Sequence, residues 1–245
     1  MTGNPNLEQN TFVVVQARMG SERLPGKTMK LLGGRPMLAY LIETILTRFP
    51  ADRIALVTSR NPENRVIREY ASKRKIWCYS GSEQDVASRY LAAIQQMPEA
   101  GYFFRICGDT PYYDPELFDT GHKEIRGRSI DFVSSMPNRG YPMGCNLELF
   151  RSSLFEEQYK NFDSAQHKEH VTSFFYERLD EFDHKLVSCQ IPGYNYDDYK
   201  FSVDTTEDFE MAAAMLARMN YEPWRYSLEE KFDLQKSIKT TSTLN

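Results

Sequence analysis

The sequence predicts an α/β fold with a mostly parallel sheet, and three observations lead to this prediction. Short β-branched runs alternate with amphipathic stretches through the first half of the chain. The chain has 245 residues, which suffice for one large domain, and 41% of them are apolar, as an extended core requires. Repeated strand–helix–strand units form right-handed crossovers, which place helices on both faces of a parallel sheet.

The first half contains four expected strands separated by expected helices. The strands are runs of aliphatic, β-branched and aromatic residues at 12–15, 54–57, 76–79 and 102–106. Apolar residues follow helical spacing over 37–49 and again over 86–94. Asn61 before Pro62 is typical of a helix start, with Asn as the cap and Pro in the first turn.

The second half departs from this alternation, because residues 135–150 are rich in Pro, Gly and Asn. The elements expected after this stretch are helices near 152–160 and 167–179, a strand over 185–191 and a short strand at 201–203. Thr205 or Thr206 is expected to cap the next helix, and Ser227 with Glu230 forms a capping box for the final one.

We therefore predict one domain over residues 11–239, with a lobe inserted near 135–195. A flexible N-terminus (1–10) is expected before the domain and a short tail (240–245) after it.

The charge and composition exclude several classes of protein. Lys and Arg number 30 against 34 Asp and Glu, a net charge of −4, whereas general nucleic-acid binders carry a basic excess. No apolar run approaches the ~20 residues of a membrane helix. The N-terminal MTGNPNLEQN lacks the layout of a signal peptide, and the four cysteines lie far apart, as expected of reduced thiols. We therefore expect a cytoplasmic protein that binds neither nucleic acid nor a membrane.

A basic, glycine-containing segment directly follows the first expected strand. It reads QARMGSERLPGK over residues 16–27 and carries the cations Arg18, Arg23 and Lys27. Loops at the carboxyl ends of parallel strands bind ligands in open α/β sheets, and glycines let a backbone approach a ligand closely. Arg and Lys suit phosphate oxygens. A solvated surface loop is the alternative, but this dense cluster favours a phosphate site, although it lacks the Walker pattern.

Two carboxylates lie where expected strands end. The segment RICGDTPYYDP (105–115) places Asp109 at one strand exit, and FSVDTTED (201–208) places Asp204 at another. Mg²⁺ commonly takes one or two protein carboxylates together with substrate oxygens and water. Asp109 and Asp204 are therefore candidate metal ligands, with helix capping as the alternative for Asp204. For Asp114, which precedes Pro115, capping is the expected role.

Five segments, in this order, resemble the cytidylyltransferase family. They are QARMGSERLPGK, GSEQDV with Arg89, RICGDTP, KEHVT (168–172) and SVDTTED. The family includes the spore-coat polysaccharide protein F-like enzymes and the synthetases that activate acidic sugars with CTP. The resemblance runs from about residue 11 to 220, and the first motif is its most specific part.

The resemblance implies a three-layer α/β/α fold of the nucleotide-diphospho-sugar transferase type and a homodimer. It also implies a Mg²⁺-dependent nucleotidyltransferase, which transfers CMP from CTP to a sugar, acidic sugar or related acceptor and releases pyrophosphate. The implied catalytic residues are Arg18, Arg23, Lys27 and Asp109. The implied nucleotide-binding residues are Gln16, Ala17, Arg18, Met19, Gly20, Ser21, Arg23, Lys27, Gly81, Ser82, Asp85 and Asp109. Asp109 and Asp204 match the family's metal-binding pair, and the lobe at 135–195 would serve the acceptor and the dimer.

The acceptor-binding residues expected from this resemblance are Asn146, Glu148 and His170. Spore-coat relatives tend to have a Gly-x-Asp-x-Glu pattern, whereas this chain has Asn146 at the Asp position. An Asn side chain is uncharged and both donates and accepts hydrogen bonds, so the identity of the acceptor is open. For His170 a structural role within a helix is the alternative. The remaining histidines, His122, His167 and His184, are expected at the surface.

Two other functions are weighed against nucleotidyl transfer. A glycosyltransferase of similar fold usually carries a DxD metal motif after a strand, and neither Asp197-Asp198 nor the acidic run 180–183 follows a strand in that way. A non-catalytic nucleotide-binding protein would have no chemical need for the three cations and two carboxylates together.

Overall fold

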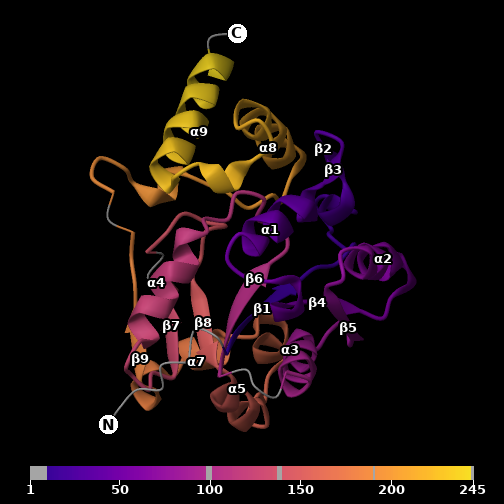
Figure 1. The fold of residues 1–245 in the computed structure, drawn as a ribbon, viewed down its shortest axis with the longest axis vertical. Coiled ribbons are helices and arrows are strands. Elements are labelled where there is room, and N and C mark those ends of the chain that lie inside the picture. Colours follow the sequence, from indigo (N-terminus) through magenta and orange to yellow (C-terminus); the bar gives the residue numbers. More distant parts are fainter. Residues whose placement is uncertain (1–9, 98–100, 137–139, 190, 244–245) are drawn as a thin grey trace.

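Seven strands form one sheet, in the order β5-β4-β1-β6-β8-β7-β9 (Figure 1). The strands are β1 (Thr11–Gln16), β4 (Ile54–Ser59), β5 (Trp77–Gly81), β6 (Tyr102–Cys107), β7 (Phe132–Ser134), β8 (Glu148–Arg151) and β9 (His184–Leu186). Every neighbouring pair is parallel except the two that involve β8, which runs antiparallel between β6 and β7. This computed structural model describes residues 10–97, 101–136, 140–189 and 191–243.

Helices cover both faces of the sheet and make three layers. They are α1 (Met37–Leu46), α2 (Arg65–Lys73), α3 (Val86–Gln95), α4 (Glu116–Ile125), α5 (Ser152–Tyr159), α6 (Ala165–His170), α7 (Ser173–Tyr176), α8 (Thr206–Arg218) and α9 (Leu228–Thr243). Alternate residues of β1 face opposite sides: Val13 and Val15 pack with α1, α4 and α8, and Phe12 and Val14 pack with α3, α5 and α7. The expected three-layer α/β/α fold with a mostly parallel sheet is confirmed.

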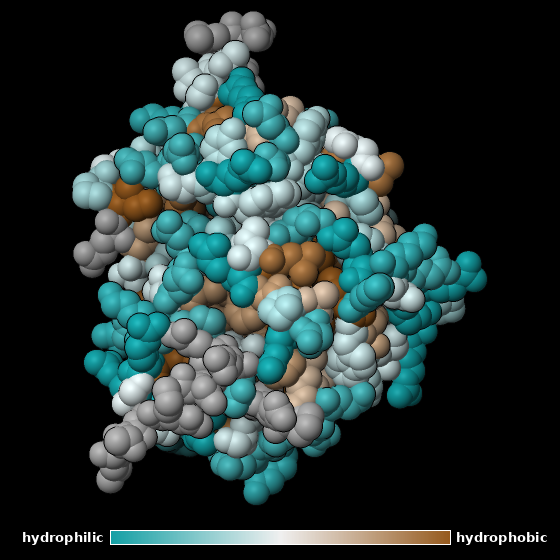
Figure 2. Space-filling view, in the orientation of Figure 1, coloured by the Kyte–Doolittle hydropathy of each residue, from teal (hydrophilic) through white to brown (hydrophobic). Residues whose placement is uncertain are grey.

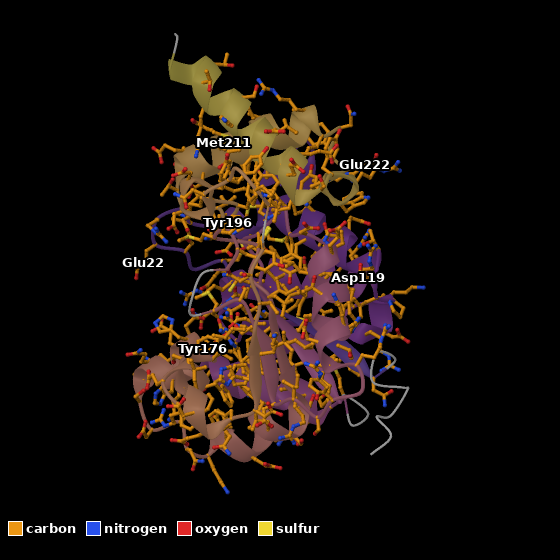
Figure 3. All side chains as sticks on the ribbon, turned by 90° about the vertical axis from the view of Figure 1, so that its left-hand side faces the viewer. Glu22, Asp119, Tyr176, Tyr196, Met211 and Glu222 are labelled. Atoms are coloured by element: carbon orange, nitrogen blue, oxygen red, sulfur yellow. The ribbon has the colours of Figure 1, made fainter. Side chains whose placement is uncertain are left out.

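Different helices lie toward the two ends of the molecule. A side view shows Met211 on α8 near one end and Tyr176 on α7 toward the other (Figure 3). The face seen in Figure 2 is mostly hydrophilic, with a hydrophobic area near its middle, over α1. In the described part of the chain, no helix combines the length and the apolar character needed to span a membrane.

Most of the expected elements form where the sequence places them. The four strands of the first half are β1, β4, β5 and β6, and the helices over 37–49 and 86–94 are α1 and α3. The Thr205 side chain accepts from Asp208 N at 3.3 Å, and Thr205 N donates back to Asp208 at 3.0 Å, which confirms the cap of α8. Ser227 and Glu230 form the expected capping box of α9, with Ser227 N donating to Glu230 at 2.8 Å.

The expected strand at 201–203 is wrong, because the backbone there bonds to loops instead of a strand. Phe201 N donates to Met143 O at 2.6 Å, and Val203 N donates to Asp109 O at 2.9 Å. The strand expected over 185–191 is also shorter, since β9 ends at Leu186. The hydrogen bond from Val203 N to Asp109 O holds Asp204 close to Asp109, although the two segments are not paired as strands of a sheet.

The helix expected over 167–179 is broken into α6 and α7. Val171 lies at a φ of 55°, which is costly for a β-branched residue and interrupts the helical hydrogen bonds. The break lets the Thr172 hydroxyl donate to Glu148 at 2.7 Å. His167, expected at the surface, is buried and contacts Glu177 at 2.9 Å. Tertiary contacts therefore override the local helical pattern here.

Asn61 does not cap a helix through its side chain, which donates to Glu83 at 3.3 Å. Asp114 has the expected role, because its carboxylate accepts from Glu116 N at 3.1 Å at the start of α4.

The boundaries of the domain and its lobe stay predictions, but the structure adds detail. The segment 135–195 contains β8 and β9, which are both strands of the main sheet, as well as α5, α6 and α7. The final helix α9 continues to Thr243, beyond the expected domain end at residue 239. The expected flexible N-terminus falls on residues 1–9, which lie outside the described residues, and on Asn10.

Candidate active site

The loop after β1 is held in one shape by its own backbone. Met19 O accepts from Ser21 N at 2.9 Å and from Gly26 N at 3.0 Å, which closes the turn. Gly26 has a φ of 71°, a conformation that favours glycine. The Thr28 hydroxyl donates to Arg18 O at 2.9 Å and anchors the other side of the loop. The loop therefore presents its cations from a fixed backbone.

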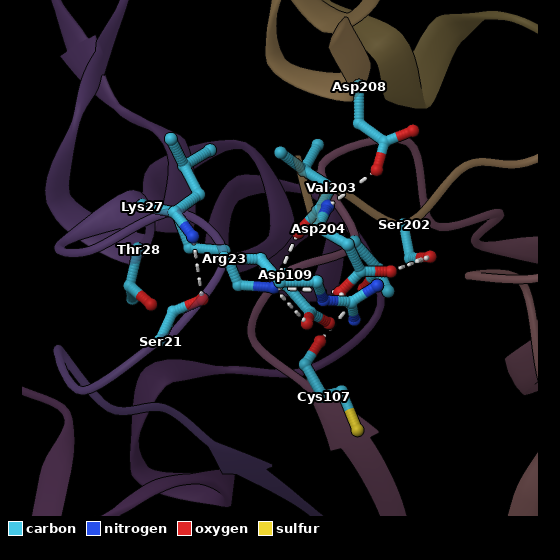
Figure 4. Close-up of polar contacts among 12 residues, drawn as sticks. Ser21, Arg23, Lys27, Thr28, Cys107, Asp109, Ser202, Val203, Asp204 and Asp208 are labelled. Atoms are coloured by element: carbon cyan, nitrogen blue, oxygen red, sulfur yellow. Dashed lines mark hydrogen bonds and ion pairs between the residues drawn. The ribbon is translucent and has the colours of Figure 1, made fainter. Parts of the chain in front are cut away.

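One of these cations lies between two carboxylates (Figure 4). Lys27 Nζ is 2.8 Å from Asp109 Oδ2, 3.1 Å from Asp204 Oδ1 and 2.5 Å from Val203 O. The Lys27 side chain is only 10% exposed. Arg23 reaches the same Asp204 oxygen at 3.1 Å from the solvent side. The structure thus joins residues 23, 27, 109 and 204 into one polar cluster.

Backbone contacts between the ends of β1 and β6 fix the position of Asp109. Gly108 N donates to Gln16 O at 2.8 Å, which ties the end of β6 to the end of β1. A Cβ atom on Gly108 would lie 3.0 Å from that same Gln16 oxygen, so a larger residue would push the two strand ends apart. This close approach fixes the start of the loop that carries Asp109.

A second cation and a second carboxylate hold Asp204. Lys200 Nζ lies 3.0 Å from Asp204 Oδ2 and 2.5 Å from Asp208 Oδ2, and Asp204 N donates to Asp208 at 2.8 Å. Burial alone would raise the pKa of Asp204, but hydrogen bonds and charge from Lys200 and Lys27 outweigh it and lower this pKa. Burial would also raise the pKa of Asp208. Hydrogen bonds donated by Lys200 and by the backbone at residues 204 and 205 outweigh this effect and lower the pKa.

These lowered pKa values predict how stability depends on pH. A carboxyl whose pKa is lower in the folded state stabilises the fold above its unfolded pKa, near 3.8, and this stabilisation is lost as the pH falls toward the folded value. We expect the Tm of the wild-type protein to fall steeply below about pH 4, and that of Asp208→Asn to fall less. Thermal unfolding between about pH 2 and 6 measures both slopes. Asp197→Asn, at an exposed carboxylate, is the control and should keep the wild-type slope. Equal slopes for Asp208→Asn and the wild type would contradict the prediction.

A cavity of about 640 Å³ opens beside the polar cluster. Nine of the expected site residues line it: Gln16, Ala17, Arg18, Ser21, Arg23, Lys27, Asp109, His170 and Asp204. Seven others do not: Met19, Gly20, Gly81, Ser82, Asp85, Asn146 and Glu148. The remaining lining residues are Glu22, Thr28, Val86, Arg89, Arg105, Cys107, Gly108 and Glu169.

Asp85 and Glu83 contact other protein groups beside this cavity. Asp85 Oδ1 accepts from Ser88 N at 2.8 Å and caps α3, and its Oδ2 accepts from the Tyr159 hydroxyl at 2.8 Å. Glu83 forms an ion pair of 3.1 Å with Arg18, whose side chain is half exposed. The pair spans the gap between the loop after β1 and the loop after β5.

The chain matches a known protein family over most of its length. The family model described as Cytidylyltransferase matches residues 12–238. The chain belongs to the cytidylyltransferase family. Members of this family are nucleotidyltransferases, so the chain is an enzyme of that class.

Relatives and solved structures agree with this membership. The chain is 27% identical to the spore coat polysaccharide biosynthesis protein SpsF of Bacillus subtilis (strain 168), over 86% of this chain and 88% of that protein. It is 32% identical to a 3-deoxy-manno-octulosonate cytidylyltransferase of Synechococcus elongatus, over 43% of each chain. The fold is similar to that of a cytidylyltransferase from Leptospira borgpetersenii, with a TM-score of 0.81, 23% identity and coverage of 96% and 95%.

The two carboxylates of this cytidylyltransferase suit a divalent cation that arrives with phosphate. They are close enough to share one ammonium group, and both offer the hard oxygen ligands that Mg²⁺ prefers. Among the described residues, no three His, Cys, Asp or Glu side chains gather as a metal cluster. Substrate oxygens and water would therefore supply the other ligands.

Arg105 is a cavity residue that the sequence motifs alone did not predict. Its guanidinium contacts Glu148 at 2.6 Å and Gln16 Oε1 at 3.1 Å, and it lines the cavity. Glu148, expected to bind the acceptor, lies buried and accepts hydrogen bonds from Arg105, Thr172 and Tyr176. Arg105 lies in the segment RICGDTP and Glu148 at the end of residues 144–148, and their pairing depends on β8 lying next to β6.

Loss of this carboxylate is expected to destabilise the fold. Glu148→Gln leaves the Arg105 guanidinium without its ion-pair partner, and breaking a buried pair typically costs about 3–5 kcal/mol. Chemical denaturation measures this loss in the free energy of unfolding. Glu157→Gln, at an exposed site on α5, is the matched control and should change it by less than about 0.5 kcal/mol. Similar values for the two variants would contradict the structural role assigned to Glu148.

Proposed function

We propose that this enzyme transfers CMP from CTP to a sugar, acidic sugar or related acceptor and releases pyrophosphate. The observation that carries the proposal is the polar cluster at the cavity edge, where Lys27 joins Asp109 and Asp204 beside the arginines of the same loop. Such a cluster offers cations for a triphosphate and carboxylates for the cation that accompanies it. The names of the relatives, a spore coat polysaccharide protein and a 3-deoxy-manno-octulosonate cytidylyltransferase, support this substrate class.

The proposed reaction exchanges one phosphorus–oxygen bond for another. An acceptor oxygen attacks the α-phosphorus of CTP, the bond to the bridging oxygen of the β-phosphate breaks, and pyrophosphate leaves. The proton of an acceptor hydroxyl is released to solvent, whereas an acceptor carboxylate or phosphate has none to lose. No general base is assigned, because the described residues around the cavity include His170 but show no contact that orients it.

The cations of the loop have different proposed roles, which depend on their positions at the cavity. Arg18, which is half exposed, and Arg23, which is largely exposed, lie at the cavity mouth, where they bind the outer phosphates and stabilise charge that develops on pyrophosphate. Lys27, which is nearly buried, reaches deeper and contacts both carboxylates. Asp109 and Asp204 would hold Mg²⁺. When bound, this ion supplies Lewis-acid polarisation of the phosphate and screens an anionic nucleophile.

The experiment that tests this proposal follows pyrophosphate. Purified protein is incubated with Mg²⁺, each of the four nucleoside triphosphates in turn, and a panel of acidic sugars and sugar phosphates. Pyrophosphate released with CTP and at least one acceptor is the expected result, and no release with any pair would overturn the proposal. Nucleoside diphosphate released from a nucleotide-sugar would instead indicate a glycosyltransferase.

The resemblance to the cytidylyltransferase family also leads us to propose that the protein is a homodimer. Light scattering measures the mass of the particle in solution and tests this proposal.

A further inference from the structure

The backbone turns sharply at Val171, between α6 and α7, in a conformation that valine rarely adopts. Its φ and ψ angles are 55° and −54°, and Thr172 N donates to His170 O at 2.5 Å, which together define a γ-turn with positive φ. Turns of this type are strained, and strained residues cluster at ligand sites, where the surrounding structure holds them in place. The surroundings of Val171 must therefore supply contacts that hold the turn.

Two buried side chains hold the turn. The Val171 side chain is fully buried in the apolar core, among residues of α3, α5 and α7. The Thr172 hydroxyl donates to Glu148 Oε1 at 2.7 Å, and Thr172 is 3% exposed. Glu148 is itself fixed, because it also accepts hydrogen bonds from Tyr176 and Arg105, each at 2.6 Å. A buried carboxylate on β8 thus locks the backbone that follows the turn.

The residue before the turn, His170, lines the cavity. The turn ends α6 at this residue, whose side chain is exposed. The imidazole has no hydrogen-bond or ion-pair partner in the part of the chain that the structure describes. The contacts of Val171 and Thr172 therefore fix the backbone from which the imidazole extends, while the ring itself stays available to a ligand.

The place of this turn relative to the sheet indicates which substrate His170 meets. Glu148 begins β8, which lies on the far side of β6 from β1. The cationic loop follows β1, and Asp109 follows β6. In an in-line displacement the attacking and leaving oxygens lie on opposite sides of the phosphorus. With pyrophosphate at the loop after β1, the attacking acceptor lies toward β8, to which Thr172 ties the backbone of His170.

We propose that the γ-turn at Val171 positions His170 to donate a hydrogen bond to an oxygen of the acceptor. Because the acceptor belongs to the proposed function, this role rests on that function and deepens it on the acceptor side. A hydroxyl, a carboxylate and a phosphate all offer such an oxygen, and an imidazole N–H can donate to it. His170 contacts the substrate in this arrangement, whereas Thr172 and Glu148 are positioning residues that act through it.

Steady-state kinetics of Thr172 variants test this role, with Mg²⁺, CTP and the acceptor that supports pyrophosphate release. Thr172→Val keeps the shape of the side chain but removes the donor. We expect the KM of the acceptor to rise about threefold to tenfold, the usual effect of one hydrogen bond, and the KM of CTP to stay unchanged. Thr172→Ser keeps the hydroxyl and should restore the wild-type value. Thr44→Val, which removes a buried hydroxyl that donates to Tyr40 O on α1, is the matched control and should change neither KM.

A double-mutant cycle separates positioning from a general loss of structure. His170→Ala should raise the KM of the acceptor at least as much as Thr172→Val does. The double variant should match His170→Ala alone, because Thr172 acts only through this side chain. Additive effects, an unchanged acceptor KM in His170→Ala, or an equal rise in the KM of CTP in Thr172→Val would each overturn the inference and leave the proposed function standing. A wild-type protein that releases no pyrophosphate with any acceptor would overturn the proposed function, and this role with it.

Discussion

Asp109→Asn should lower kcat for cytidylyl transfer by about 10³-fold or more, while the fold stays intact. The substitution keeps the shape of the side chain but removes the charge that lies 2.8 Å from Lys27 Nζ. A bound metal ion contributes several kcal/mol to transition-state stabilisation, and each 1.36 kcal/mol changes the rate about tenfold. Initial rates of pyrophosphate release with saturating CTP and acceptor measure the effect.

Two further measurements distinguish the loss of a metal ligand at Asp109 from a general effect of the substitution on the protein. Mn²⁺ binding in the presence of CTP, followed by electron paramagnetic resonance, should weaken in Asp109→Asn, because one of the two proposed carboxylate ligands is lost. Asp119→Asn, on the exposed side of α4, is the matched control and should keep the wild-type rate, Tm and Mn²⁺ affinity. A kcat for Asp109→Asn within tenfold of the wild type would contradict the proposed role of Asp109 as a metal ligand.

Lys27→Met should lower kcat by about 10²–10³-fold, the usual effect of removing one preorganised donor from developing negative charge. Methionine fills a similar volume but cannot contact Asp109, Asp204 and Val203 O, which all bond to Lys27 Nζ. Because these acceptors would lose a nearly buried partner, the free energy of unfolding should also fall by about 1–3 kcal/mol. Steady-state kinetics and chemical denaturation measure the two effects separately.

The pattern of the kinetic change distinguishes the possible roles of Lys27. Loss of an interaction made only in the transition state lowers kcat and kcat/KM together, whereas loss of ground-state binding raises KM alone. An increase in KM for CTP with an unchanged kcat would therefore contradict the assigned role. Lys30→Met is the matched control, because Lys30 is exposed and contacts the ring of Phe209 at 5.1 Å. We expect wild-type kcat from this variant.

Local patterns in the sequence account for the four strands of the first half and for the loop that follows the first of them, whereas β7 and β8 were not expected. The strand at 11–16 is predicted by four consecutive apolar residues, and the loop at 16–27 by its glycines and cations. These features depend on interactions between residues that are close in the chain. The α8 cap, made by Thr205 and Asp208, belongs to the same class, since its contacts span three residues.

The sequence prediction fails where contacts between distant residues decide the local structure. Val171 interrupts an otherwise helical pattern, and the residue after it, Thr172, donates to Glu148, which lies 24 positions away. The segment 201–203 has strand composition, but its backbone bonds to Met143 and Asp109. Neither outcome follows from periodicity, because the competing partner belongs to another part of the chain.

The sequence alone determined which groups the site contains: a basic loop after the first strand and two aspartates at the ends of later segments. Only the tertiary structure decided how these groups meet. Lys27 and its two carboxylates are 82 and 177 positions apart, and the packing of β6 beside β1 and the loop contacts of residue 203 bring them within 3.1 Å. It also decided that Glu148 pairs with Arg105, because β8 lies next to β6 in the sheet.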